Sequence, residues 1–109
     1  MGNIHETAII YDNVIIGNNV TIGPYCIIGA TAEIKDDFTK SKGVIIGDNT
    51  IITGNCTIDS GYNRPTTIGE GCFIMKGVHI GHDSLISDFV TLSAHCVIAG
   101  HVEIEPHCN

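Results

Sequence analysis

An aliphatic residue recurs at every sixth position along most of this sequence. The series contains fifteen isoleucines and one leucine: Ile4, Ile10, Ile16, Ile22, Ile28, Ile34, Ile46, Ile52, Ile58, Ile68, Ile74, Ile80, Ile86, Leu92, Ile98 and Ile104. A period of six fits neither an amphipathic α-helix nor a coiled coil. It predicts a solenoid, in which each turn of the chain contacts only the turns next to it.

Two further columns of the repeat are biased. Glycine follows the aliphatic residue at Gly17, Gly23, Gly29, Gly47, Gly69 and Gly81, and a small residue often stands four positions after it, as at Ala8, Cys26 and Ser84. We expect each hexapeptide to form one short strand and one corner, and three of them, about 18 residues, to close a triangular coil. Successive coils would pair in parallel about 4.8 Å apart. The aliphatic residue would fill the interior, the small residue would fit the inward bend, and glycine would permit the tight corner.

The predicted fold is therefore all-β: a left-handed parallel β-helix of about five to six coils. We expect residues 1–109 to form a single domain. Two polar stretches interrupt the repeat, one with Lys40 where an aliphatic residue is due and one with ten residues between Ile58 and Ile68. Both contain glycine or proline and predict projecting loops near 35–45 and 59–67. Loops on a rigid scaffold commonly carry function.

The composition excludes several classes of partner. The formal net charge is −7 and no run of basic residues occurs, which argues against nucleic acid or an anionic membrane surface. No stretch approaches the roughly 20 apolar residues needed to cross a bilayer, and the first residues do not resemble a secretory signal. We expect a soluble, cytoplasmic protein with no membrane insertion.

All five cysteines occupy the small column of the repeat: Cys26, Cys56, Cys72, Cys96 and Cys108. Buried free cysteines commonly act as compact hydrophobic residues. An odd count without a Cys-x-x-Cys spacing fits a reducing compartment. We expect these thiols to be structural, with neither a disulfide framework nor a metal site.

Three histidines share another column: His95, His101 and His107. Consecutive hexapeptides lie on different faces, so these side chains cannot meet on one metal ion within a chain. Residues about 18 apart stack vertically in such a coil, which places His101 above Asp83, close enough to interact. The same rule leaves His95 above Gly77 and His107 above Phe89, on solvated surface.

The segment FIMKGVHIGHDSLIS places His79 and His82 at outward-facing positions, with Asp83 adjacent. A solenoid surface offers no deep cleft, so an active site there needs a second subunit as a wall. This segment, followed by VIAGHVEI, resembles the central part of hexapeptide-repeat sugar acyltransferases, the family that includes UDP-N-acetylglucosamine O-acyltransferase of lipid A synthesis. The opening IHETAIIYDNVIIGNNVTIGPYCIIG is similar to that family's N-terminus, so the resemblance covers most of the chain.

The resemblance implies roles for the histidine block. His82 would be the general base, removing the proton of the acceptor hydroxyl as it attacks an acyl thioester, a task suited to imidazole. His79 would position the substrate, and Asp83 would orient an imidazole. His101 would line the acyl or cofactor groove. The family's homotrimers have active sites between subunits, which would supply the missing wall.

Two further residues complete the predicted site. A backbone amide near Gly100 is a physically plausible oxyanion donor. Lys76 replaces a small or amide side chain of the family and is a candidate for contacting a substrate phosphate. No metal and no bound cofactor are expected, and the co-substrate would be acyl-CoA or acyl carrier protein.

The sequence departs from the family in three places. The family's sugar-binding loop contains a Gln-Asp-Leu-Lys-Tyr stretch, whereas this chain has ATAEIKDDFTKSKGVI. Asp59 and Ser60 stand where the family has a His-Arg-Gly run. The chain also reaches Asn109 before the family's remaining coils and its basic C-terminal helices, which dock acyl carrier protein.

The leading interpretation is acyl transfer from a thioester to a hydroxyl of a sugar or nucleotide sugar. The close alternative is a sugar-nucleotide N-acetyltransferase, because related hexapeptide enzymes acylate amines with a similar histidine. A different alternative is a non-enzymatic, shortened β-helix scaffold. A further one is a zinc site shared between subunits, as in γ-class carbonic anhydrases, which would need three histidines from two chains.

Overall fold

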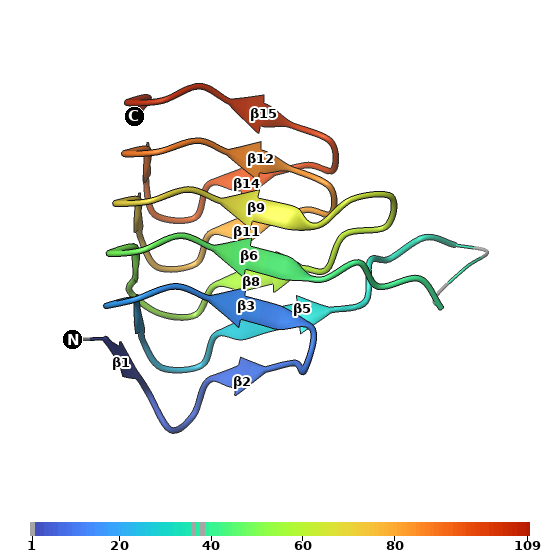
Figure 1. Cartoon of the computed structure of the whole chain (residues 1–109), viewed down its shortest axis with the longest axis horizontal. Helices are drawn as coiled ribbons and strands as arrows, with labels where there is room; N and C mark the ends of the chain where they lie inside the picture. Colours follow the sequence, from blue (N-terminus) through green and yellow to red (C-terminus); the bar gives the residue numbers. More distant parts are fainter. Residues whose placement is uncertain (1, 36, 38) are drawn as a thin grey trace.

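The computed structural model describes residues 2–35, 37 and 39–109. Its strands are β1 (Asn3–Ile4), β2 (Ile9–Ile10), β3 (Val14–Ile16), β4 (Thr21–Ile22), β5 (Ile27–Ala30), β6 (Val44–Ile46), β7 (Ile51–Ile52), β8 (Thr57–Asp59), β9 (Thr66–Ile68), β10 (Phe73–Ile74), β11 (His79–Ile80), β12 (Leu85–Ile86), β13 (Thr91–Leu92), β14 (Val97–Ile98) and β15 (Glu103–Ile104). Every third strand joins the same sheet, giving three five-stranded parallel sheets. The chain therefore winds around a triangular prism in stacked coils, with its two ends at opposite ends of the stack (Figure 1). The predicted all-β coil is confirmed.

The interior is built from the six-residue aliphatic column. Ile52 pairs in register with Ile22 on one side and Ile74 on the other, and all three are almost completely buried. Identical branched side chains thus stack along the axis, where each contributes about 1.5–3 kcal/mol by leaving water. The small column is buried beside them, as Val20 and Cys56 illustrate.

The glycine column has a different physical basis from the one we expected. A Cβ at Gly23 would lie 1.9 Å from the carbonyl oxygen of Thr53 in the next coil, so glycine is required by close stacking. Within the column, Gly29 has a positive φ of 98°. Other left-handed positions lie two residues after a column glycine, where Asn19, Asn49 and Gly71 have φ values of 60°, 62° and 66°. Asparagine and glycine tolerate this left-handed region better than most residues.

Two loops leave the coil on the same side of the molecule (Figure 1). The first joins β5 to β6 and spans 31–43, and the second joins β8 to β9 and spans 60–65. These segments overlap the stretches in which the sequence predicts loops, near 35–45 and 59–67. The observed limits differ from the predicted ones, because Val44 and Thr66 begin the strands that follow the loops and Asp59 ends the strand before the second loop. Positions 36 and 38 of the first loop lie outside the described residues.

Ile34 does not belong to the interior column, although its spacing placed it there. Ile16 pairs directly with Ile46, so the chain between them bypasses one stacking position. Ile34 instead lies half-buried in the first loop, in an isolated antiparallel bridge with Asp37. Ile34 fits the six-residue spacing only because the insertion is two repeats long. Such an insertion leaves the spacing of the aliphatic residues unchanged, although its own residues do not join the stack.

The cysteines follow the small column, but their burial depends on the coil that covers them. Cys26, Cys56 and Cys72 are buried, Cys96 is half-buried and Cys108 is exposed. The expectation of burial was therefore wrong for Cys108, because no coil among the described residues stacks on its side of the fifth coil. All five thiols are free. Nowhere in the described residues is there a helix long and apolar enough to span a membrane.

Candidate functional site

The corner between β11 and β12, together with the corner stacked on it between β14 and β15, brings together three side chains of the predicted site. The Nδ1 atom of His82 lies 2.8 Å from Oδ2 of Asp83, and Nε2 of His101 lies 3.4 Å from the same oxygen. The two imidazole rings meet edge to face, with centroids 5.1 Å apart. The predicted stacking of His101 over Asp83 is confirmed, and one carboxylate oxygen is shared by two imidazoles.

Asp83 is completely buried and is held by the second loop. Its Oδ1 atom accepts hydrogen bonds from the backbone N–H groups of Tyr62, Asn63 and Arg64, at 3.1, 2.8 and 2.7 Å. Burial acts to raise the pKa of Asp83, but the hydrogen bond from His82 and those from the loop outweigh it and lower the pKa to about 2. Asp83 is therefore a carboxylate at neutral pH.

The ionised Asp83 determines the tautomer of His82. A carboxylate can only accept hydrogen bonds, so Nδ1 of His82 must carry the proton that it shares with Oδ2. This leaves a lone pair on Nε2. The Nε2 atom faces Gly100, where a Cβ would lie only 2.6 Å away. The N–H of Gly100 donates no hydrogen bond to any residue that the structure describes. The arrangement places a proton acceptor beside a free backbone donor.

His79 lies on the outer face of β11, the strand that leads directly into the corner carrying His82 and Asp83. Its Nδ1 atom is 2.7 Å from Oγ1 of Thr57, and its Nε2 atom is 3.6 Å from Oδ2 of Asp59. A hollow of about 300 Å³ opens here, lined by Ile27, Ala30, Thr31, Glu33, Thr57, Asp59 and His79. Burial raises the pKa of Asp59. The electrostatic interaction with His79 lowers this pKa, and the negative charge of Glu33 raises it further. This face thus combines two carboxylates with an imidazole.

The structure separates Lys76 from the other predicted site residues. Lys76 is exposed at the corner between β10 and β11, whereas His82 occupies the corner between β11 and β12. Its role in binding substrate stays a prediction. His95 stacks over Gly77 and His107 stacks on Phe89, and both imidazoles are exposed as expected.

The second loop is a part of the site that the sequence did not reveal. Its three N–H groups hold the carboxylate that orients His82, yet no side chain of the segment DSGYNRPTT announces that task. The sequence indicated this contact only through position, because the four extra residues fall in the coil directly below Asp83. Backbone donors carry no sequence signature of their own.

The ligand atoms of His82, Asp83 and His101 all lie within 4.8 Å of one another, a spacing that a metal ion can bridge. The set differs from the shared zinc site considered above, because all three groups come from one chain. Every oxygen of Asp83 is already engaged by hydrogen bonds to the loop or to His82. This pattern favours a role in proton transfer over metal binding.

The fold and the corner together define the class of protein: a parallel β-helix of hexapeptide repeats with a histidine–aspartate pair on its surface. The sequence profile described as bacterial transferase hexapeptide (six repeats) matches residues 2–36 and 65–100. The chain belongs to this hexapeptide-repeat transferase family, whose β-helix is left-handed.

Relatives of this chain include proteins named as acyltransferases. The chain is 31% identical to acyl-[acyl-carrier-protein]–UDP-N-acetylglucosamine O-acyltransferase of Campylobacter concisus, over 95% of this chain and 55% of that protein. It is 32% identical to UDP-3-O-acylglucosamine N-acyltransferase of Leptospira biflexa, over 91% of this chain and 30% of that protein. The crystal structure of the UDP-N-acetylglucosamine acyltransferase of Bacteroides fragilis superposes with a TM-score of 0.89 at 32% identity, covering 94% of this chain and 41% of that one. The chain thus spans about half the length of the Campylobacter relative and less than half of the other two.

Proposed function

We propose that this chain forms the active site of an acyltransferase that moves an acyl group from a thioester to a hydroxyl of a sugar or nucleotide sugar. The observation that carries the proposal is the geometry of His82, whose Nδ1 is held by Asp83 while Nε2 faces Gly100. The names of the relatives support the same reaction class.

In the proposed reaction the acceptor hydroxyl oxygen attacks the thioester carbonyl carbon, and its proton passes to Nε2 of His82. Asp83 stabilises the imidazolium ion that forms. The carbonyl becomes a tetrahedral oxyanion, which the free N–H of Gly100 would stabilise. Collapse of this intermediate breaks the carbon–sulfur bond, and the departing thiolate takes the proton from His82.

The remaining residues have supporting roles in this proposal. His101 shares the oxygen of Asp83 and would line the donor groove, and His79 would hydrogen-bond the acceptor. The donor would be acyl-CoA or acyl carrier protein, with no resident cofactor. Lys76 would reach the substrate only if the ligand or a second chain extends to its corner.

A homotrimer would complete the site. In the sheet of β2, β5, β8, β11 and β14, one outer column runs through Ile27, Thr57, His79 and Val97, which are paired in register. Ile27 and Val97 are 37% and 71% exposed, so apolar surface lies on both sides of the polar pair. A second subunit packed against this column would bury it and supply the wall that an open solenoid face lacks.

The hollow beside His79 favours a second candidate, transfer to an amine. Asp59 and Glu33 offer carboxylate oxygens to an amino group, and no Lys or Arg is among the lining residues. The Leptospira relative is named as an N-acyltransferase. The same base and oxyanion donor would serve either acceptor, because both reactions pass through a tetrahedral intermediate.

The test is release of free thiol from acyl-CoA and acyl-carrier-protein donors, with panels of hydroxyl and amino sugar nucleotides. We expect release that requires an acceptor and that falls at least 100-fold in His82→Ala. His95→Ala is the matched control, because it removes an exposed imidazole from another corner. Equal release by wild type and His82→Ala, or no release by the well-folded protein with any acceptor, would favour the scaffold alternative.

A further inference from the structure

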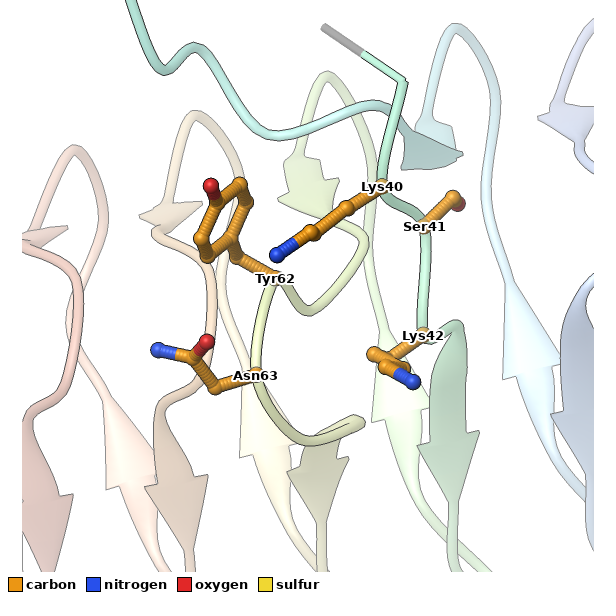
Figure 2. Close-up of a pocket in the computed structure, with 5 residues that line it drawn as sticks. All are labelled: Lys40, Ser41, Lys42, Tyr62 and Asn63. Atoms are coloured by element: carbon orange, nitrogen blue, oxygen red, sulfur yellow. The ribbon is translucent and has the colours of Figure 1, made fainter. Parts of the chain in front are cut away.

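A second hollow lies between the two loops, away from the β11 face. It encloses about 410 Å³ and is lined by Lys40, Ser41, Lys42, Tyr62 and Asn63. Figure 2 shows Lys40 reaching from the first loop toward the ring of Tyr62, with Asn63 next to Tyr62 on the second loop and Lys42 beyond Ser41 on the first. The volume falls within the range of small-molecule pockets.

This hollow is cationic in an acidic protein. The chain has only five Lys and Arg residues and a net charge of −7, yet Lys40 and Lys42 both line this one space. No carboxylate lines it, and among the described residues none lies within salt-bridge distance of either ammonium group. Arg64, on the same loop as Tyr62, is already engaged by Glu103 and by the carbonyl of Asp83.

One carboxylate lies near the rim. Asp37 accepts a hydrogen bond from the hydroxyl of Tyr62 at 3.1 Å. Hydrogen bonds from Thr39 chiefly lower the pKa of Asp37, with a smaller contribution from the charge of Lys40. Asp37 therefore offsets part of the charge of Lys40. Lys42 has no such neighbour among the described residues.

The walls of the hollow are held in place before any ligand arrives. The buried hydroxyl of Ser60 accepts the N–H of Gly43 at 2.7 Å and lies 2.6 Å from the hydroxyl of Ser41. The N–H of Lys42 donates to the carbonyl of Gly61 at 2.7 Å, which ties the two loops together. A preorganised wall lowers the entropic cost of binding.

The opposite wall is fixed to the candidate catalytic corner. Tyr62 and Asn63 donate their backbone N–H groups to Asp83, whose other oxygen orients His82. The ammonium of Lys40 lies 4.8 Å from the centre of the Tyr62 ring, within cation–π range. A ligand held in this hollow would thus contact the same short loop that positions the proposed base.

We infer that this hollow is a phosphate subsite, in which Lys40 and Lys42 bind phosphate oxygens and the amide of Asn63 donates a further hydrogen bond. Two ammonium groups that line one space, and that form no salt bridge with any residue the structure describes, are suited to a phosphorylated ligand. The inference rests on the proposed function and narrows it, because one of the two substrates must then carry phosphate. The phosphate belongs either to a nucleotide-sugar acceptor or to the coenzyme A donor.

Equilibrium binding by calorimetry tests the subsite without turnover. The probes are inorganic pyrophosphate, UDP and coenzyme A, each titrated into wild type, Lys42→Gln and Lys35→Gln. We expect pyrophosphate to bind wild type, to bind more weakly at higher salt, and to lose about tenfold or more in affinity in Lys42→Gln. Lys35→Gln is the matched control, since it removes an exposed lysine from the same loop but not from the lining.

The two nucleotide probes distinguish the source of the phosphate. A Lys42-dependent affinity for UDP assigns the subsite to the acceptor, and one for coenzyme A assigns it to the donor. Pyrophosphate that fails to bind, or that binds Lys42→Gln and Lys35→Gln equally, overturns the subsite even if thiol release still depends on His82. Lys42-dependent binding without any thiol release keeps the subsite and rejects the acyltransferase.

Discussion

Gly100 lies so close to His82 that a single added carbon would collide with the imidazole. A Cβ at Gly100 would be 2.6 Å from Nε2 and 2.8 Å from Cε1 of that ring. The ring is held on its other side by Asp83, so it cannot retreat without breaking that hydrogen bond. Gly100 thus provides both the space for the proposed base and the free N–H beside it.

Gly100→Ala should therefore lower the rate of acyl transfer while leaving the coil folded. Displacement of a catalytic group by about 1 Å can cost on the order of 100-fold in rate. The measurement is kcat for thiol release together with the thermal midpoint of unfolding. Gly54→Ala is the control, because its Cβ would meet no atom closer than 3.3 Å. A Gly100→Ala enzyme with unchanged kcat would show that His82 is not the base.

Asp83 should make the fold sensitive to acid. Its pKa is lowered from 3.8 to about 2 in the folded chain, so the native state binds this proton less tightly than the unfolded state. The resulting stabilisation, about 2 kcal/mol, is present above pH 4 and is lost as the pH falls toward 2. Denaturant unfolding between pH 2 and 6 measures it. Asp83→Asn should be less stable at pH 6 and should lack most of the decline in this window; an unchanged decline would assign it to other carboxylates.

Asp59 should have the opposite effect on stability. Because burial raises its pKa, the folded state binds the proton more tightly than the unfolded state, and stability decreases as the pH rises through the raised pKa. Asp59→Asn should therefore raise the thermal midpoint at pH 7 more than at pH 4. If the amine-acceptor candidate is correct, the same variant should raise KM for amino sugars but not for hydroxyl acceptors. A midpoint that drops equally at both pH values would contradict the burial cost.

The stacked aliphatic column should carry most of the stability. Ile52→Ala removes a fully buried side chain between two stacked isoleucines and should cost about 2–5 kcal/mol in the free energy of unfolding. Ile4→Ala changes the same column in the first coil, where the side chain is 46% exposed, and should cost much less. Denaturant titration of both variants gives the comparison. Equal losses would mean that the interior does not stabilise the coil by burial.

The vertical order of the corners could be predicted because it depends only on local repetition. Once three hexapeptides make one coil, His101 must lie above Asp83, and the structure has their polar atoms 3.4 Å apart. The same arithmetic failed for Ile34, because a loop of two whole repeats keeps the period while leaving the stack. Periodicity reports the phase of a residue but not whether its strand pairs.

The sequence by itself determined the coil, the buried columns and the placement of His82, Asp83 and His101 at one corner, because these follow from spacing along a regular backbone. Only the tertiary structure decided what surrounds that corner. The N–H groups of loop 60–65 that hold Asp83, and the hollow that this loop forms with Lys40 and Lys42, arise where two insertions of irregular path meet. An irregular loop has no repeating spacing from which its path could be predicted. Almost every residue type carries a backbone N–H, so the sequence does not indicate which N–H groups will bind Asp83. Their positions are therefore set by three-dimensional contacts that spacing cannot encode.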